Sequence, residues 1–177
     1  MTWFVFAFLT AVFRSFTDVA GKSTLKNMDE YIVAWSLFLF ALPFFGALLF
    51  FTEIPEIGKN FWIALFVGGG LNVITNLLYM RAIKISDLSI TIPLITFTPL
   101  FMLITSPIIV GEFPNIFGIA GIVLIVSGSY ILNFKEKKKG YLAPFKALLK
   151  EKGPRLMLLV AFIWSITANL DKIGIEN

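Results

Sequence analysis

The sequence predicts an all-α, polytopic membrane protein with about six apolar helices, and three observations support this fold class. Hydrophobic residues make up 58% of the chain and charged residues 15%, whereas a soluble domain has roughly 45–50% and 25%. The mean hydropathy is +0.86. Charged residues gather between long apolar blocks and leave those blocks almost uncharged. Because an isolated strand leaves its backbone unpaired in lipid, even the β-branched segments 90–95 and 119–126 are expected to be helical.

A helix needs about 20 apolar residues to cross the hydrocarbon core, and the chain offers six such segments. The predicted spans are residues 3–20, 31–51, 61–83, 88–110, 115–134 and 156–177. Short connections with turn residues join the first five, so successive spans are expected to be antiparallel neighbours. The N-terminus lacks a basic region and a small-residue cleavage site, which indicates a retained first helix and not a signal peptide.

The longest connection, residues 135–155, carries eight of the 15 Lys and Arg residues. Its centre, residues 141–149, has apolar spacing that suits a short helix on the membrane surface, and a solvated linker is the alternative. Because basic loops stay in the cytoplasm, this linker and the loops after the first and third spans are predicted to be cytoplasmic. The net charge of +4 therefore indicates topology, and we expect no nucleic-acid partner.

Two residue types that commonly carry chemistry are absent from the chain, which has no Cys and no His. Their absence excludes disulfides, a thiolate nucleophile and the commonest general base and metal ligand. No phosphate-binding loop or paired-carboxylate site is visible either. We therefore expect no enzyme, no metal and no cofactor.

An internal repeat relates the first span to the last at an offset of 150 residues. Identical pairs in the alignment are Leu9 and Leu159, Ala11 and Ala161, Ser15 and Ser165, Thr17 and Thr167, Lys22 and Lys172, and Asn27 and Asn177. The second copy begins five spans after the first, an odd number, so it must enter the membrane in the opposite sense. Inverted repeats of this kind are common in secondary transporters.

An ordered set of short motifs extends along the first five spans. The set comprises Tyr79-Met80-Arg81-Ala82, Ile85-Ser86-Asp87-Leu88-Ser89, Thr98-Pro99-Leu100, Gly111-Glu112, Gly118, Gly121 and Gly128. In this order the motifs resemble the EamA-type domain of the drug/metabolite transporter superfamily. The resemblance implies ten helices in two inverted repeats of five, a central solute cavity and no ATP hydrolysis. It also implies that both ends are cytoplasmic, which conflicts with the count of basic residues.

The repeat and the resemblance together divide the chain into three parts. Residues 1–134 are predicted to form the first five-helix repeat, residues 135–155 a basic linker, and residues 156–177 the start of an inverted second repeat. We therefore expect a fragment of a protein about twice as long. Such a fragment alone is not expected to transport, and would need a second repeat or self-association.

Five polar or proline positions in spans three and four are candidates to line a solute cavity: Asn72, Asn76, Tyr79, Thr98 and Pro99. The two asparagines are four residues apart on one helix face close to the tyrosine, and amides should not face lipid. Interhelical hydrogen bonding is the alternative explanation. Prolines in span four remove backbone donors, so a broken helix at a binding site and an ordinary kink both remain open.

A candidate charged pair, Arg14 and Asp18, lies four residues apart in the first span. Ionisable residues inside a membrane are functional candidates, but this pair could also be structural and reach towards the headgroups. Glu112 is predicted to close the turn between spans four and five, with proton coupling as the alternative. The stripe of Gly118, Gly121 and Gly128 predicts close helix packing.

The favoured function is a secondary transporter that moves a small organic metabolite or drug-like solute by alternating access. One alternative is a non-transporting membrane subunit that acts by helix–helix interaction. A small multidrug-type exporter fits less well, because the first span has no membrane-embedded Glu. The expected partners are a small-molecule solute and membrane lipid, and the expected location is the prokaryotic plasma membrane.

Overall fold

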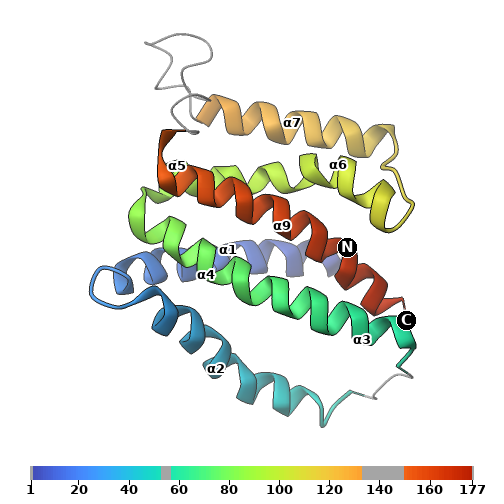
Figure 1. Ribbon diagram of the computed structural model, residues 1–177, viewed down its shortest axis with the longest axis horizontal. Helices are drawn as coiled ribbons and strands as arrows, with labels where there is room; N and C mark the ends of the chain where they lie inside the picture. Colours follow the sequence, from blue (N-terminus) through green and yellow to red (C-terminus); the bar gives the residue numbers. More distant parts are fainter. Residues whose placement is uncertain (1, 53–56, 133–149, 177) are drawn as a thin grey trace.

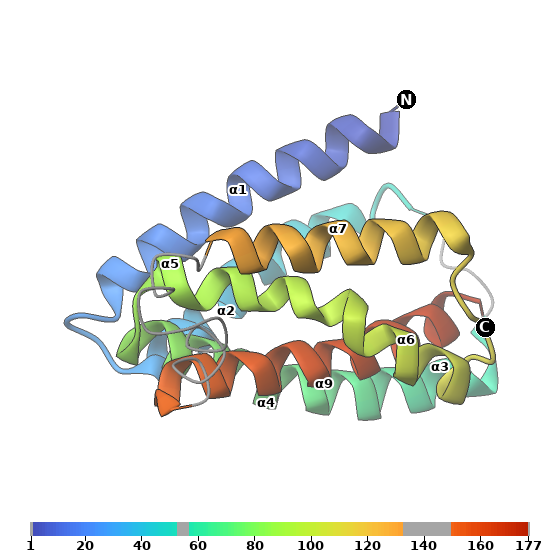
Figure 2. The ribbon, with the colours of Figure 1, turned by 90° about the horizontal axis from the view of Figure 1, so that it is seen from above.

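A computed structural model describes residues 2–52, 57–132 and 150–176, and this part of the chain is helical without any strand. The helical elements are α1 (Thr2–Thr24), α2 (Glu30–Leu48), α3 (Lys59–Ile63), η1 (Ala64–Gly68), α4 (Gly69–Ile85), α5 (Leu88–Thr91), η2 (Ile92–Phe97), α6 (Thr98–Ile109), α7 (Ile116–Leu132) and α9 (Lys152–Ile175). Successive spans run up and down through the bundle, and α1 and α9 run in opposite directions (Figures 1 and 2). The all-helical fold class predicted from the sequence is confirmed.

Five helical rods in the described residues are long and apolar enough to cross a membrane. They are Phe4–Thr24, Glu30–Leu48, Lys59–Ile85, Leu88–Ile109 and Lys152–Ile175. The fifth predicted span corresponds to α7, which is apolar but only 17 residues long. The first span continues to Thr24 and the last begins at Lys152, each four residues beyond the predicted limit. The predicted surface helix at 141–149 lies outside the described residues.

The third span is one rod of 27 residues whose middle is not a regular α-helix. Between α3 and α4, the turn η1 (Ala64–Gly68) is π-helical. Single π-helical turns inside α-helices are rare and often mark functional sites. The three consecutive glycines at 68–70 make this part of the rod narrow, and a Cβ on Gly68 would lie 3.6 Å from the Cβ of Leu170 on α9. The rod therefore approaches α9 closely at its irregular turn.

The fourth span is also interrupted, by the 3₁₀ segment η2 between α5 and α6. Pro93 and Pro99 are the second residues of η2 and α6 respectively, and each lacks the N–H that an α-helical bond would use. The hydroxyl of Thr96 donates to the carbonyl of Pro93 at 2.5 Å. Pro107, by contrast, lies inside α6 without ending it. The prolines that change the helix type are therefore the first two.

Helix α9 is the best-buried span and lies between α4 and α6 (Figure 1). Its inner face buries Met157, Val160 and Ala161 completely. Small residues allow the close approach: a Cβ on Gly153 would lie only 2.3 Å from the Cβ of Ser86, and one on Gly174 would lie 3.1 Å from that of Ala64. Both η1 and η2 pack against α9, so this helix contacts the irregular turn of each neighbouring span.

The outer helices α1, α2 and α7 expose large apolar side chains, as expected for surfaces that face lipid. Among the described residues, nothing lies within 4 Å of a Cβ added at Gly121 or Gly128. In the described part of the chain, the predicted packing stripe on α7 therefore has no neighbour at these two positions. At the third, Gly118, an added Cβ would lie 3.1 Å from Pro114 in the preceding turn.

Candidate functional site

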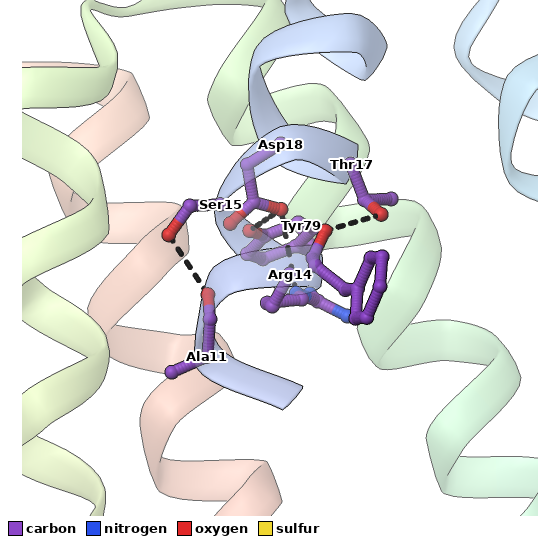
Figure 3. A network of polar contacts seen from close by, with 7 residues as sticks. Ala11, Arg14, Ser15, Thr17, Asp18 and Tyr79 are labelled. Atoms are coloured by element: carbon purple, nitrogen blue, oxygen red, sulfur yellow. Dashed lines mark hydrogen bonds and ion pairs between the residues drawn. The ribbon is translucent and has the colours of Figure 1, made fainter. Parts of the chain in front are cut away.

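A polar cluster forms where α1, α4 and α9 meet, and it joins two groups of candidate residues (Figure 3). Arg14 Nε lies 3.3 Å from Asp18 Oδ1 on the same helix. The hydroxyl of Tyr79, from α4, donates to that same oxygen at 2.6 Å. Trp164, from α9, packs against the tyrosine with ring centroids 5.5 Å apart.

The helical spacing of four residues brings Arg14 and Asp18 onto one face of α1, and the facing rings complete the cluster. The guanidinium carbon lies 4.9 Å from the centroid of Tyr79 and 5.9 Å from that of Trp164. Aromatic faces at this distance attract cations. The arginine is therefore held by a carboxylate on one side and by two rings on the other.

The cluster lies near the middle of its helix. Arg14 comes 12 residues after the first residue of α1 and 10 before the last, which places it about 18 Å and 15 Å from the two ends at about 1.5 Å per residue. The hydrocarbon core is about 30 Å thick. Because α1 continues to Thr24, the arginine lies nearer the middle of its helix than the predicted span suggested, and its guanidinium contacts the rings of Tyr79 and Trp164.

The members of the cluster differ in how far they are buried. Tyr79 is fully buried, and the side chain of Asp18 is 10% exposed, whereas that of Arg14 is 46% exposed. The acid and the phenol are thus enclosed by the protein, while the arginine presents part of its guanidinium outwards. A guanidinium carries several N–H donors in a planar fork, so the exposed side can bind a further polar group.

Trp164 was not among the residues singled out from the sequence, although the repeat contained a signal for it. The offset of 150 residues aligns Arg14 with Trp164. In the structure these two equivalent positions are close neighbours across α1 and α9. A search for repeat-equivalent positions that differ in chemistry would have found this residue.

The two asparagines of α4 lie apart from the cluster. Asn76 and Asn72 are half-buried, and the side-chain nitrogen of Asn76 donates to the carbonyl of Asn72 at 2.8 Å. Asn76 also lines an apolar groove of about 600 Å³ between α2 and α4, together with Trp35 and Tyr31. Of the predicted cavity-lining residues in span three, only Tyr79 therefore contacts the charged pair.

The two candidates in span four lie at the junction of η2 and α6. The hydroxyl oxygen of Thr98 is buried and has no hydrogen-bond partner among the described residues. Pro99 lines a separate pocket of about 240 Å³ that also includes Glu112 and Phe113. Deeper in α6, Thr105 accepts a hydrogen bond from Asn169 of α9 at 3.2 Å. The contacts of this span are therefore with α7 and α9 and are distinct from the charged pair.

Charged residues at the ends of the bundle hold the helices together outside the cluster. Lys22 donates to the carbonyl oxygens of Ile83 at 2.5 Å and Ser86 at 2.7 Å, and so caps the end of α4. At the other end, Lys172 pairs with Glu112 in the turn between α6 and α7. The two lysines are equivalent in the repeat, yet they make different contacts. Glu112, predicted to close this turn, pairs instead with a residue of α9.

The family model of the EamA-like transporter family matches residues 1–134. No curated protein and no solved structure is significantly similar to the chain.

Proposed function

Because the family model covers residues 1–134, the chain belongs to the EamA-like transporter family, and we propose that, together with a second repeat or a second copy of itself, it moves a small organic solute by alternating access. Membership makes it an integral, multi-pass membrane protein and a transporter of the drug/metabolite type. We propose the prokaryotic plasma membrane as its location. We place the solute site at the cluster of Arg14, Asp18, Tyr79 and Trp164.

The observation that carries this proposal is an arginine that is 46% exposed near the middle of a membrane span. A charged residue at the centre of a spanning helix costs about 2.5–3.5 kcal/mol on insertion scales. The pairing of Arg14 with Asp18 and the aromatic rings offsets part of that cost. A purely structural pair gains nothing from an exposed guanidinium, whereas a solute site needs free donors. The enclosed acid and phenol then orient the arginine for its ligand.

The relation between α1 and α9 supports the same location. In an inverted repeat, an axis in the membrane plane exchanges the two copies, and the solute site lies near the midplane where the copies meet. A residue approaches its own counterpart only close to that axis. Arg14 and Trp164 are counterparts at the offset of 150 residues, and the guanidinium carbon lies 5.9 Å from the indole centroid. We therefore propose that the axis passes through the cluster.

Two interruptions of regular helix support a change of shape around this site. The π-helical η1 and the 3₁₀ segment η2 both pack against α9. Sharp bends in helices occur at such irregular turns and at prolines. Rocking of α9 against spans three and four at these turns would open the site to one side of the membrane and then the other.

The direct test measures solute binding by residues 1–177 in lipid nanodiscs. Replacing Trp3, Trp35 and Trp62 by Phe leaves Trp164 as the only tryptophan and hence a reporter of the cluster. We would titrate amino acids, organic acids, nucleosides and organic cations. At least one class should change the fluorescence saturably.

Two variants on α1 make this test specific. Arg14→Gln should abolish the response, whereas Ser15→Ala should preserve it, because the Ser15 hydroxyl bonds only to the carbonyl of Ala11 within its own helix at 2.9 Å. A response to every solute class that survives Arg14→Gln, or no saturable response at all, would reject this site. Flux into liposomes, measured for the solute found, then tests transport separately from binding.

A further inference from the structure

A basic groove of about 540 Å³ lies between the end of α4 and the start of α9. Arg81, Lys152 and Arg155 line it, and all three are exposed. None of them takes part in an ion pair within the described residues. Glu30, an acid near this end of α4, is engaged by Lys84 at 2.6 Å. None of the three cations is therefore held in an ion pair within the described residues, although Glu30 interacts electrostatically with Arg81 and Glu151 precedes Lys152 in the chain.

The charged and apolar parts of the groove lie at different depths. Arg81 is four residues before the end of α4, and Arg155 is three residues after the start of α9. Both are thus within about one turn of a helix end, at the level of the headgroups. Leu78 and Leu159 also line the groove, and each lies about 5–6 Å further along its helix, towards the membrane centre. The groove is basic at its outer end and apolar at its inner end.

We propose that this groove binds an anionic phospholipid, with the headgroup on Arg81, Lys152 and Arg155 and an acyl chain along Leu78 and Leu159. The order of charge and hydrocarbon along the groove matches that of a phospholipid. A free anion would use the rim and leave the apolar lining without a partner. A second copy docked groove to groove would bring six like charges together, which is unfavourable. This proposal does not depend on the identity of the solute or on transport.

A lipid in this position would join a helix of the first repeat to α9 at their closest approach. Gly153 and Ser86 touch there without room for a side chain on the glycine, and Lys22 caps the same end of α4. Anionic lipid should therefore stabilise the contact between α4 and α9 as well as bind the groove.

The test uses purified residues 1–177 and native mass spectrometry with phosphatidylglycerol and phosphatidylcholine of identical acyl chains. The unmodified chain should retain phosphatidylglycerol at least about tenfold more strongly. Each basic residue near an anionic lipid contributes roughly fivefold in affinity. The double variant Arg81→Gln/Arg155→Gln should therefore lose about 25-fold of the affinity for phosphatidylglycerol.

A matched control removes the same amount of charge elsewhere. Lys26→Gln/Lys59→Gln takes two exposed lysines from outside the groove and should change the affinity by no more than about twofold, since neither residue touches the lipid. An equal loss in both double variants would mean attraction by net charge alone, and would overturn the site. Circular dichroism and gel filtration of each variant establish that it is folded.

The remaining arms separate the proposed lipid from other occupants. Excess inorganic phosphate should not displace phosphatidylglycerol, and displacement would identify a free-anion site instead. Leu159→Gln should weaken binding of long-chain phosphatidylglycerol more than that of a short-chain analogue, and equal effects would remove the acyl-chain part of the proposal. Equal affinity for the two lipids, or a protein dimer that forms only when the groove is intact, would overturn it.

Discussion

The contact between Gly153 and Ser86 permits a test of the packing that brings α9 into the bundle. A Cβ on Gly153 would lie 2.3 Å from the Cβ and 2.6 Å from the Oγ of Ser86, whereas non-bonded carbon atoms prefer about 3.5–4.0 Å. Ser86 cannot easily move away, because its carbonyl accepts a hydrogen bond from Lys22 at 2.7 Å. The substitution Gly153→Ala should therefore push α9 and α4 apart by more than about 1 Å.

The expected cost follows from overpacking, which typically destabilises a core by about 1–3 kcal/mol. Gly121→Ala is the matched control, since nothing in the described chain lies within 4 Å of its added Cβ. In a helix interior, alanine is favoured over glycine by roughly 0.5–1 kcal/mol, so this control should be neutral or stabilising. The double variant Gly153→Ala/Ser86→Gly removes both clashing atoms and leaves the carbonyl of Ala82 at 3.3 Å. It should recover most of the lost stability.

Equilibrium unfolding in mixed micelles, followed by far-ultraviolet circular dichroism and tryptophan fluorescence, gives the free energy of unfolding for the four proteins. The decisive comparison is between the changes in the free energy of unfolding caused by Gly153→Ala and by Gly121→Ala, which should not both be decreases. A Gly153→Ala protein as stable as the unmodified chain would show that α9 does not approach α4 as closely as described. Failure of Ser86→Gly to restore stability would show that the cost arises elsewhere.

Three further predictions concern the cluster, the interface of α6 and α9, and the topology. Tyr79→Phe keeps the ring and removes the hydroxyl that donates to Asp18 at 2.6 Å. The free energy of unfolding should therefore fall by about 0.6–1.7 kcal/mol, as for other interhelical hydrogen bonds in membranes. An unchanged free energy of unfolding would show that this bond is not formed. Asn169→Ala removes the hydrogen bonds to Thr105 at 3.2 Å and to the Ser165 carbonyl at 2.6 Å, and it should lower the free energy of unfolding by a similar amount in the same assay. A gain in stability would contradict the described packing. Because the chain has no cysteine, Lys26→Cys introduces a single thiol. An impermeant maleimide should label this thiol only after the membrane is opened. Ready labelling on intact cells would place the basic loops outside.

The positions of the spans were predictable because a helix that crosses the hydrocarbon core needs a nearly continuous apolar segment of fixed length, which a helix in water does not. The interruption of span four was also foreseeable, since Pro93 and Pro99 each lack an N–H and cannot continue regular hydrogen bonding. The π-helical η1 was not foreseen. Its residues Ala64–Gly68 include no proline, and its packing against α9 cannot be read from the local sequence.

The candidate site was predictable only in part, and the reason is again physical. Spacing along one helix places Arg14 beside Asp18, and Tyr79 was singled out because it lies close to the helix face of the two asparagines of span three. The contact between Tyr79 and Asp18 requires α4 to pack against α1 at the level of these residues. The contact of Trp164 with Tyr79 and Arg14 requires α9 to pack beside them. Periodicity within a helix reports which residues share a face, but it does not report which other helix covers that face.

The sequence alone therefore determined that the chain is a multi-pass helical membrane protein of a transporter family, because hydropathy, helix breakers and ordered motifs are local properties. Only the tertiary structure decided that α9 is the best-buried span and that Arg81 and Arg155 share a groove. It also decided which polar residues form one cluster, namely Arg14, Asp18, Tyr79 and Trp164. Asn76 lies apart from this cluster and faces α2. In lipid, apolar surfaces have no strong preference for one another. Helix partners are chosen instead by close approach at small residues such as Gly153 and by buried polar bonds such as that between Asn169 and Thr105, which depend on three-dimensional fit.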